Sequence, residues 1–200
     1  MTTSTGRPLM ALVLVSAFLA AGCLGGNAPT RFYVLSPGEM AAVAAPDTLT
    51  ITIGLGPVGL SGYLDRPQIV TRPAADKIDI GEFDQWGEPL RDGISRVLAE
   101  DLARQMPSAR ISVFPWRGLE QILYQVVVDV TRFDGTAGGD LALEARWRIL
   151  DAAGKEIAVK TTRLTEPTGS PGYSATVSAM SRALARLSRD IAQALAALPR

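Results

Sequence analysis

Residues 141–150, with the sequence LALEARWRIL, decide the fold class of this 200-residue chain. Apolar residues at every second position alternate with charged ones, which is the pattern of a strand with one covered face. The runs QVVVDVTRF (125–133) and KEIAVKTTRLTE (155–166) are also strand-like. The turn-forming stretches DGTAGGD and DAAG separate the three runs. They therefore predict an antiparallel three-stranded meander.

Further elements are expected on both sides of this meander. Strand-like runs occupy residues 31–35, 48–55, 68–72, 77–83 and 109–115. A helix is predicted over 88–106, between Pro89 and Pro107, and a second from about Ser170 to Leu198. The apolar residues of the second helix recur about every 3.6 positions, the α-helical period. We expect an α+β fold: a mostly antiparallel sheet with two helices packed on one face.

The first 22 residues have the features of an export signal. The apolar run from Leu9 to Ala21 is shorter than the ~20 residues of a membrane-spanning helix and matches a signal-peptide core. Cys23, the only cysteine, follows Ala20-Ala21-Gly22, which resembles the lipobox of bacterial lipoproteins. We expect cleavage before Cys23 and lipidation of its thiol. The alternatives are a secreted protein with a free thiol and an uncleaved anchor.

The anchor would be followed by a short tether. Residue 24 is Leu rather than Asp, which under the enterobacterial sorting pattern implies the outer membrane. Residues 24–30, which include Gly25, Gly26 and Pro29, reach about 25 Å when fully extended. We therefore divide the chain into a signal peptide (1–22), a lipidated tether (23–30) and a single domain (31–200). The domain must stay close to its membrane, so work at the opposite membrane requires a partner that spans the gap.

Composition excludes several classes of function. The chain has no histidine, which rules out Ser/His/Asp and Cys/His catalysis and histidine-ligated zinc. The formal net charge of zero argues against nucleic-acid binding. Residues 54–59 match GxGxxG, but Gly62 and Pro67 oppose the helix that a dinucleotide site requires. We expect no enzyme activity, no cofactor and no metal.

Two stretches are candidate interaction sites. In GYLDRPQIVTR (62–72), adjacent apolar and oppositely charged residues precede a stiffening proline, as in a preformed recognition loop. The alternative is a structural turn in which Asp65 caps backbone N–H groups. In FDQWGEPL (83–90), Trp86 precedes a helix and either fills the core or anchors a contact. The candidate partner or subunit interface comprises Tyr63, Leu64, Asp65, Arg66, Pro67, Gln68 and Trp86.

These stretches resemble the PqiC family of ABC-type transport auxiliary lipoproteins. The resemblance rests on YLDRPQIV (63–70), Trp86, EPL (88–90), RVLAEDL (96–102) and FYVLSP (32–37). It implies an α/β sandwich similar to the N-terminal domain of TolB and an outer-membrane lipoprotein facing the periplasm. It also implies a PqiB-like MCE-domain tunnel protein as partner in lipid transport, and copies that can form a ring.

A lipoprotein regulator of a cell-wall synthase, LpoB-like, is the alternative function. Such regulators pair a lipobox with a similar α/β domain. They usually need a long linker to pass through the peptidoglycan, and the seven residues between Cys23 and the expected domain argue against this function.

Overall fold

The computed structural model describes residues 28–39, 42, 51–116, 121–136 and 139–199. They form β1 (Arg31–Tyr33), β2 (Ile51–Leu60), β3 (Gln68–Ala74), β4 (Lys77–Trp86), α2 (Leu90–Gln105), β5 (Ala109–Val113), β6 (Tyr124–Gly135), β7 (Asp140–Asp151), β8 (Glu156–Pro167) and α3 (Tyr173–Ala196). Each expected strand and helix is present, with ends that differ from the predicted ones by a few residues; residues 48–50 of the predicted strand 48–55 lie outside the described residues.

The larger sheet contains five strands in the order β5-β2-β6-β7-β8. Strands β6, β7 and β8 pair antiparallel, which confirms the predicted meander. Strand β2 runs parallel to both β5 and β6. The β3–β4 hairpin and α2 lie between β2 and β5 in the chain, and such a crossover brings the chain back to run in the same direction.

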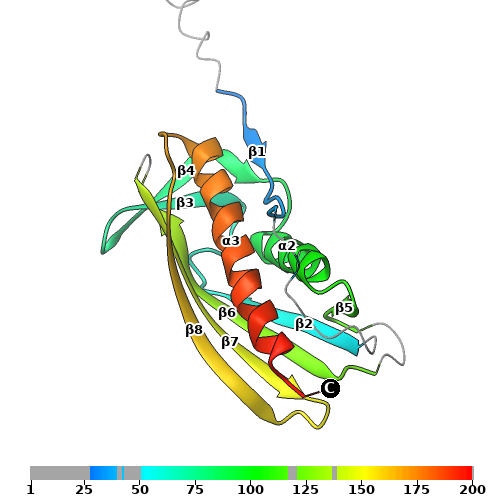
Figure 1. The fold of residues 1–200 in the computed structure, drawn as a ribbon. Helices are drawn as coiled ribbons and strands as arrows, with labels where there is room; N and C mark the ends of the chain where they lie inside the picture. The colour runs from blue at the N-terminus through cyan, green and yellow to red at the C-terminus, as the bar shows by residue number, and fades with distance from the viewer. Residues whose placement is uncertain (1–27, 40–41, 43–50, 117–120, 137–138, 200) are drawn as a thin grey trace, which may run out of the picture.

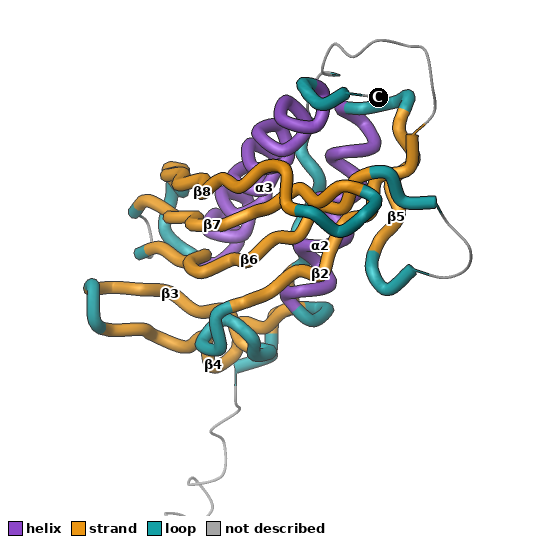
Figure 2. The backbone as a smooth tube through the Cα atoms, turned by 90° about the horizontal axis from the view of Figure 1, so that it is seen from below, coloured by secondary structure: helices purple, strands orange, loops and turns teal. Residues whose placement is uncertain are grey.

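The remaining strands form a second, smaller sheet in the order β1-β4-β3 (Figure 2). Strands β3 and β4 form an antiparallel hairpin, and β1 pairs parallel with the end of β4, Arg31 opposite Asp84. Both sheets are therefore mixed. Alternation along a strand shows which face is covered but not which strand is the neighbour, so the sequence did not predict this division into two sheets.

Both helices cover the same face of the larger sheet (Figure 1). Helix α3 packs on β7 and β8, and α2 packs on β2, β5 and α3. The inward residues of β7 are at most 1% exposed, and so are most apolar residues of the α3 stripe: Met180, Leu184, Leu187, Ile191 and Leu195. The expectation of an α+β fold with two helices on one face is confirmed.

Residues 34–39 lead from β1 onto the two helices and are held there by side chains. Arg96 donates to the Leu35 carbonyl (2.9 Å), and the Ser36 N–H donates to the Ser181 hydroxyl (3.1 Å). The Gly38 N–H donates to the Asp101 carboxylate (2.9 Å). The start of the described chain is thus fixed to the body of the domain. It lies at the opposite end of the molecule from the C-terminus (Figure 1).

Asp101 is a carboxylate buried at this junction. Its side chain is fully buried, and Oδ2 has no hydrogen-bond partner among the described residues. Burial raises the pKa of Asp101 from 3.8 to about 6, against the opposing effects of the Gly38 N–H and the Arg104 guanidinium 3.9 Å away. Because the pKa is higher in the folded state, the native protein binds this proton more tightly than the unfolded chain does.

We predict that Asp101→Asn stabilises the protein at neutral pH. The contribution of protonated Asp101 to the free energy of unfolding is fully present below pH 3.8. It is lost as the pH rises through about 6. An amide keeps an acceptor for Gly38 without a buried charge. The variant should therefore gain about 1–2 kcal/mol at pH 7.5 and little near pH 4. Urea denaturation across this range measures the gain, and Asp92→Asn, at an exposed position of α2, is the control. A gain that does not depend on pH would contradict the assignment.

Candidate functional site

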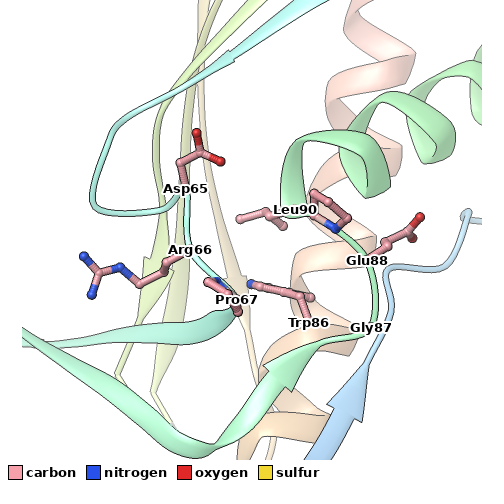
Figure 3. A pocket seen from close by; sticks show the side chains of 8 residues that line it. Asp65, Arg66, Pro67, Trp86, Gly87, Glu88 and Leu90 are labelled. Atoms are coloured by element: carbon pink, nitrogen blue, oxygen red, sulfur yellow. The ribbon is translucent and has the colours of Figure 1, made fainter.

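The two stretches that the sequence singled out lie on opposite sides of one pocket at the start of α2 (Figure 3). The pocket encloses about 410 Å³. One side comes from the loop after β2 and the other from the segment that joins β4 to α2. Its lining residues, which define what we call the Trp86 pocket, are Asp65, Arg66, Pro67, Trp86, Gly87, Glu88, Pro89 and Leu90.

Tight turns shape the loop side of the pocket. After β2 the Ser61 N–H donates to the Val130 carbonyl (3.0 Å), which pins the loop to β6. The Leu64 N–H then donates to Ser61 O (2.9 Å), and the Arg66 N–H donates to Leu64 O (2.9 Å). The Leu64 side chain is only 2% exposed and anchors the loop in the core. The backbone of the pocket wall is therefore held in place before any partner binds.

A backbone hydrogen bond joins the two sides of the pocket. The Trp86 N–H donates to the Pro67 carbonyl (2.7 Å), and the next N–H, that of Gly87, donates to Tyr33 O in β1 (2.8 Å). Pro89 then precedes the first residue of α2, where its missing N–H is not needed. Trp86 is 7% exposed, so it fills the core and presents an edge to the pocket. Trp86 therefore belongs to the core, and its role as an anchor of a contact stays a prediction.

Charged groups surround the apolar floor of the pocket. Asp65 accepts a hydrogen bond from Arg91 (2.8 Å), which joins the loop to α2. Glu88 accepts one from Arg96 (2.6 Å), and this bond raises the pKa of the Arg96 guanidinium. Arg66 differs from both arginines: its Nε is buried without a hydrogen-bond partner among the described residues. Its guanidinium points away from the pocket (Figure 3).

Of the seven predicted interface residues, four line the pocket and three do not. Asp65, Arg66, Pro67 and Trp86 line the pocket. Leu64 is buried in the core, and Gln68 pairs with Gln85 in the small sheet. The expected alternative role of Asp65, capping backbone N–H groups, is replaced by its ion pair with Arg91. The interface itself stays a prediction, as does lipidation of Cys23, which lies outside the described residues.

Tyr63 belongs to a different cluster, centred on Asp134. Its hydroxyl donates to Asp134 Oδ2 (2.5 Å), while Arg72 and Arg132 donate to Oδ1 (3.0 and 3.1 Å). The Arg72 guanidinium also lies 5.0 Å from the centroid of the Tyr63 ring. Burial raises the pKa of Tyr63, and its hydrogen bond to Asp134 adds to the effect. The sequence indicated no role for Asp134, because two of its three partners, Arg72 and Tyr63, lie 62 and 71 residues away.

The described residues show no arrangement suited to binding a metal. No three His, Cys, Asp or Glu side chains among them come together as potential ligands. Within the same part of the chain, no helix has the length and apolar character needed to cross a membrane. The GxGxxG match falls inside and at the end of β2, and the next helix begins only at Leu90. The context for a dinucleotide site is therefore missing, as expected.

Comparison with known proteins places the chain in a family. Two crystal structures share the fold. One, of an uncharacterized protein, is 18% identical with a TM-score of 0.71, over 84% of this chain and 99% of its own. The other, of XCC0632 from Xanthomonas campestris, described as a DUF330 family member, is 17% identical with a TM-score of 0.69, over 82% and 93%. No curated protein matches the sequence. The model of the ABC-type transport auxiliary lipoprotein component matches residues 33–192. The chain therefore belongs to the family of ABC-type transport auxiliary lipoproteins.

Proposed function

We propose that this protein is a non-catalytic docking subunit of a PqiB-like MCE-domain lipid transport system. In this proposal Cys23 carries the lipid anchor, and the domain faces the periplasm from the outer membrane. Membership of a family of auxiliary transport lipoproteins supports this role. The short tether supports it too, because a domain held within about 25 Å of its anchor needs a partner that spans the envelope.

The observation that carries the proposal is the Trp86 pocket. Apolar residues form its floor, and charged residues stand at its rim, which is the composition of a contact hot spot. The loop wall is pinned to β6 and to α2, so a partner would bind it without first ordering it. Arg66 belongs to the loop wall, and a carboxylate of the partner could pair with its guanidinium beside the pocket.

A photocrosslinking amino acid at position 66 tests the docking role. We expect a photocrosslinking residue in place of Arg66 to capture the MCE-domain tunnel protein in cells. The matched control is Arg146, an exposed arginine of β7 on the sheet face turned away from the helices. Arg66→Ala should also lower recovery of the tunnel protein at least fivefold on co-purification, with an unchanged unfolding midpoint, whereas Arg146→Ala should leave recovery unaffected.

The captured protein distinguishes the possible functions. Equal capture from positions 66 and 146 would contradict docking at the Trp86 pocket. A cell-wall synthase captured specifically from position 66 would favour the LpoB-like alternative and refute the transport partner.

We further propose that copies of the protein assemble into a ring, a property supported by the resemblance to the PqiC family. Native mass spectrometry of the purified lipidated protein measures the assembly directly. A monomer at every concentration would contradict the ring and would leave the docking site to be judged by crosslinking.

A further inference from the structure

Strand β1 and the residue after it have two chemically different sides. Side chains alternate along an extended chain, so residues 31, 33 and 35 share one side. Arg31 and Tyr33 both bond to the buried carboxylate of Asp84 (2.7–2.9 Å), and Leu35 is 2% exposed in the core. Phe32 and Val34 fall on the other side and are 67% and 52% exposed. The exposed side is therefore apolar, and it adjoins the first turns of α3.

This apolar side is rigidly held. Burial alone would raise the pKa of Asp84, but the hydrogen bonds from Arg31 and Tyr33 outweigh it and hold the pKa below its usual value. Asp84 therefore stays ionised and clamps β1 to β4. Residues 35–38 are fixed to both helices by the bonds from Arg96 and to Ser181 and Asp101. Phe32 and Val34 thus have a set direction relative to the whole domain.

Phe32 also lies next to the anchor in the sequence. Phe32 is the ninth residue after Cys23, so at about 3.5 Å per residue it remains within roughly 32 Å of the lipid attachment point. The anchor therefore presents a membrane to this surface in every copy of the protein. The effective concentration of the membrane at this surface is high. A weak apolar contact with it therefore does not have to overcome the entropy of association.

We propose that Phe32 and Val34 form a membrane-contact surface that lies in the headgroup region of the anchoring membrane. The inference rests on the proposed anchor at Cys23. Two side chains are far smaller than the ~800 Å² per partner of a stable protein interface, but they suffice for contact with a bilayer already in reach. The contact would orient the domain, so the tether would not leave it free to rotate.

The orientation has a consequence for the Trp86 pocket. Gly87, in the pocket lining, donates its N–H to Tyr33 O, and a Cβ on Gly87 would lie 3.1 Å from Val34 Cγ1. The pocket therefore adjoins the proposed membrane surface. A partner that occupies it would sit beside the lipid headgroups, where a tunnel for lipids has to end.

A single-thiol fluorescence experiment tests the surface. In the lipidated protein Cys23 is blocked, so Val34→Cys provides one reactive thiol for an environment-sensitive NBD label. The protein is reconstituted in phosphatidylethanolamine/phosphatidylglycerol vesicles with or without doxyl-labelled lipid. The control is Val159→Cys, whose valine is 46% exposed on β8. Val159 pairs with Arg148 close to the turn that joins β7 to β8. This turn is at the end of the molecule where the C-terminus lies, opposite β1 (Figure 1).

We expect doxyl lipid to quench the label at position 34 at least threefold more than the label at position 159. Adding Phe32→Asp should remove at least half of this quenching without changing the far-ultraviolet circular dichroism, because Phe32 is exposed. Equal quenching at both positions would overturn the inference. So would a label at position 34 that is shielded from iodide but not quenched by doxyl lipid, which would mean that another protein molecule covers the surface.

Flotation of the vesicles distinguishes a failure of the contact surface from a failure of the proposed anchor at Cys23. Protein that floats but shows no lipid quenching at position 34 refutes the contact surface alone. Protein that does not float refutes the anchor at Cys23, and the contact surface with it.

Discussion

Replacing Asp134 with alanine is expected to lower the free energy of unfolding by about 3–5 kcal/mol. Asp134 is fully buried and accepts hydrogen bonds from Tyr63, Arg72 and Arg132. Removing it leaves the largely buried Arg72 guanidinium and the Tyr63 hydroxyl without their acceptor. The cluster also joins β3 of the small sheet and the loop after β2 to β6. The substitution should therefore weaken the attachment of one sheet to the other.

Thermal and urea denaturation measure this loss. For a domain of this size the expected shift of the thermal midpoint is on the order of 10 °C. The matched control is Asp129→Ala on the same strand, because Asp129 is 49% exposed and lies 3.8 Å from Arg148. An exposed pair of this kind contributes at most about 1 kcal/mol. Equal losses for the two variants would show that Asp134 is no more important than a surface charge.

Replacing Cys23 with serine is expected to abolish acylation and to leave the protein as an uncleaved precursor. The serine hydroxyl cannot form the diacylglyceryl thioether, and signal peptidase II should no longer cleave the precursor. Each buried CH₂ of an acyl chain contributes about 0.8 kcal/mol, and without these chains only the uncleaved apolar run from Leu9 to Ala21 can hold the precursor at a membrane. Metabolic labelling with a fatty acid and membrane fractionation measure the result.

Leu24→Ala is the control for this variant, because it leaves Cys23 and the three small residues before it intact. It should retain acyl labelling. Continued labelling of Cys23→Ser would show that lipid is attached elsewhere and would contradict the lipobox interpretation.

The sequence predicted those elements whose pattern is local. The alternation in LALEARWRIL predicted β7, and its apolar residues are the buried ones. The 3.6-residue spacing in the last helix likewise predicted the stripe of α3 that packs on the sheet. Strand partners were predictable only where a short turn joins neighbours, as in β6–β7–β8 and β3–β4. The parallel pairing of β2 with β5 and β6 connects segments far apart in the chain, and no local pattern encodes it.

The candidate site shows the same division. The loop from Tyr63 to Pro67 and the segment around Trp86 stood out in the sequence, and the resemblance to the PqiC family rests on them. The bond from the Trp86 N–H to the Pro67 carbonyl is a tertiary contact, and it brings the two stretches together as one pocket. The sequence also did not predict that Asp65 pairs with Arg91. Nor did it predict that Leu64 lies in the core and Gln68 in the small sheet, both outside the pocket.

By itself the sequence determined the lone cysteine, the absence of histidine, and the periodicity of the strands and helices, and it predicted the export signal. These properties depend on residue identity and on spacings of a few positions. The tertiary structure alone decided the two mixed sheets, the Asp134 cluster, the Trp86 pocket and the apolar side of β1. Each of these depends on which distant segments become neighbours, and that is decided by burying all the apolar faces together rather than by any one stretch.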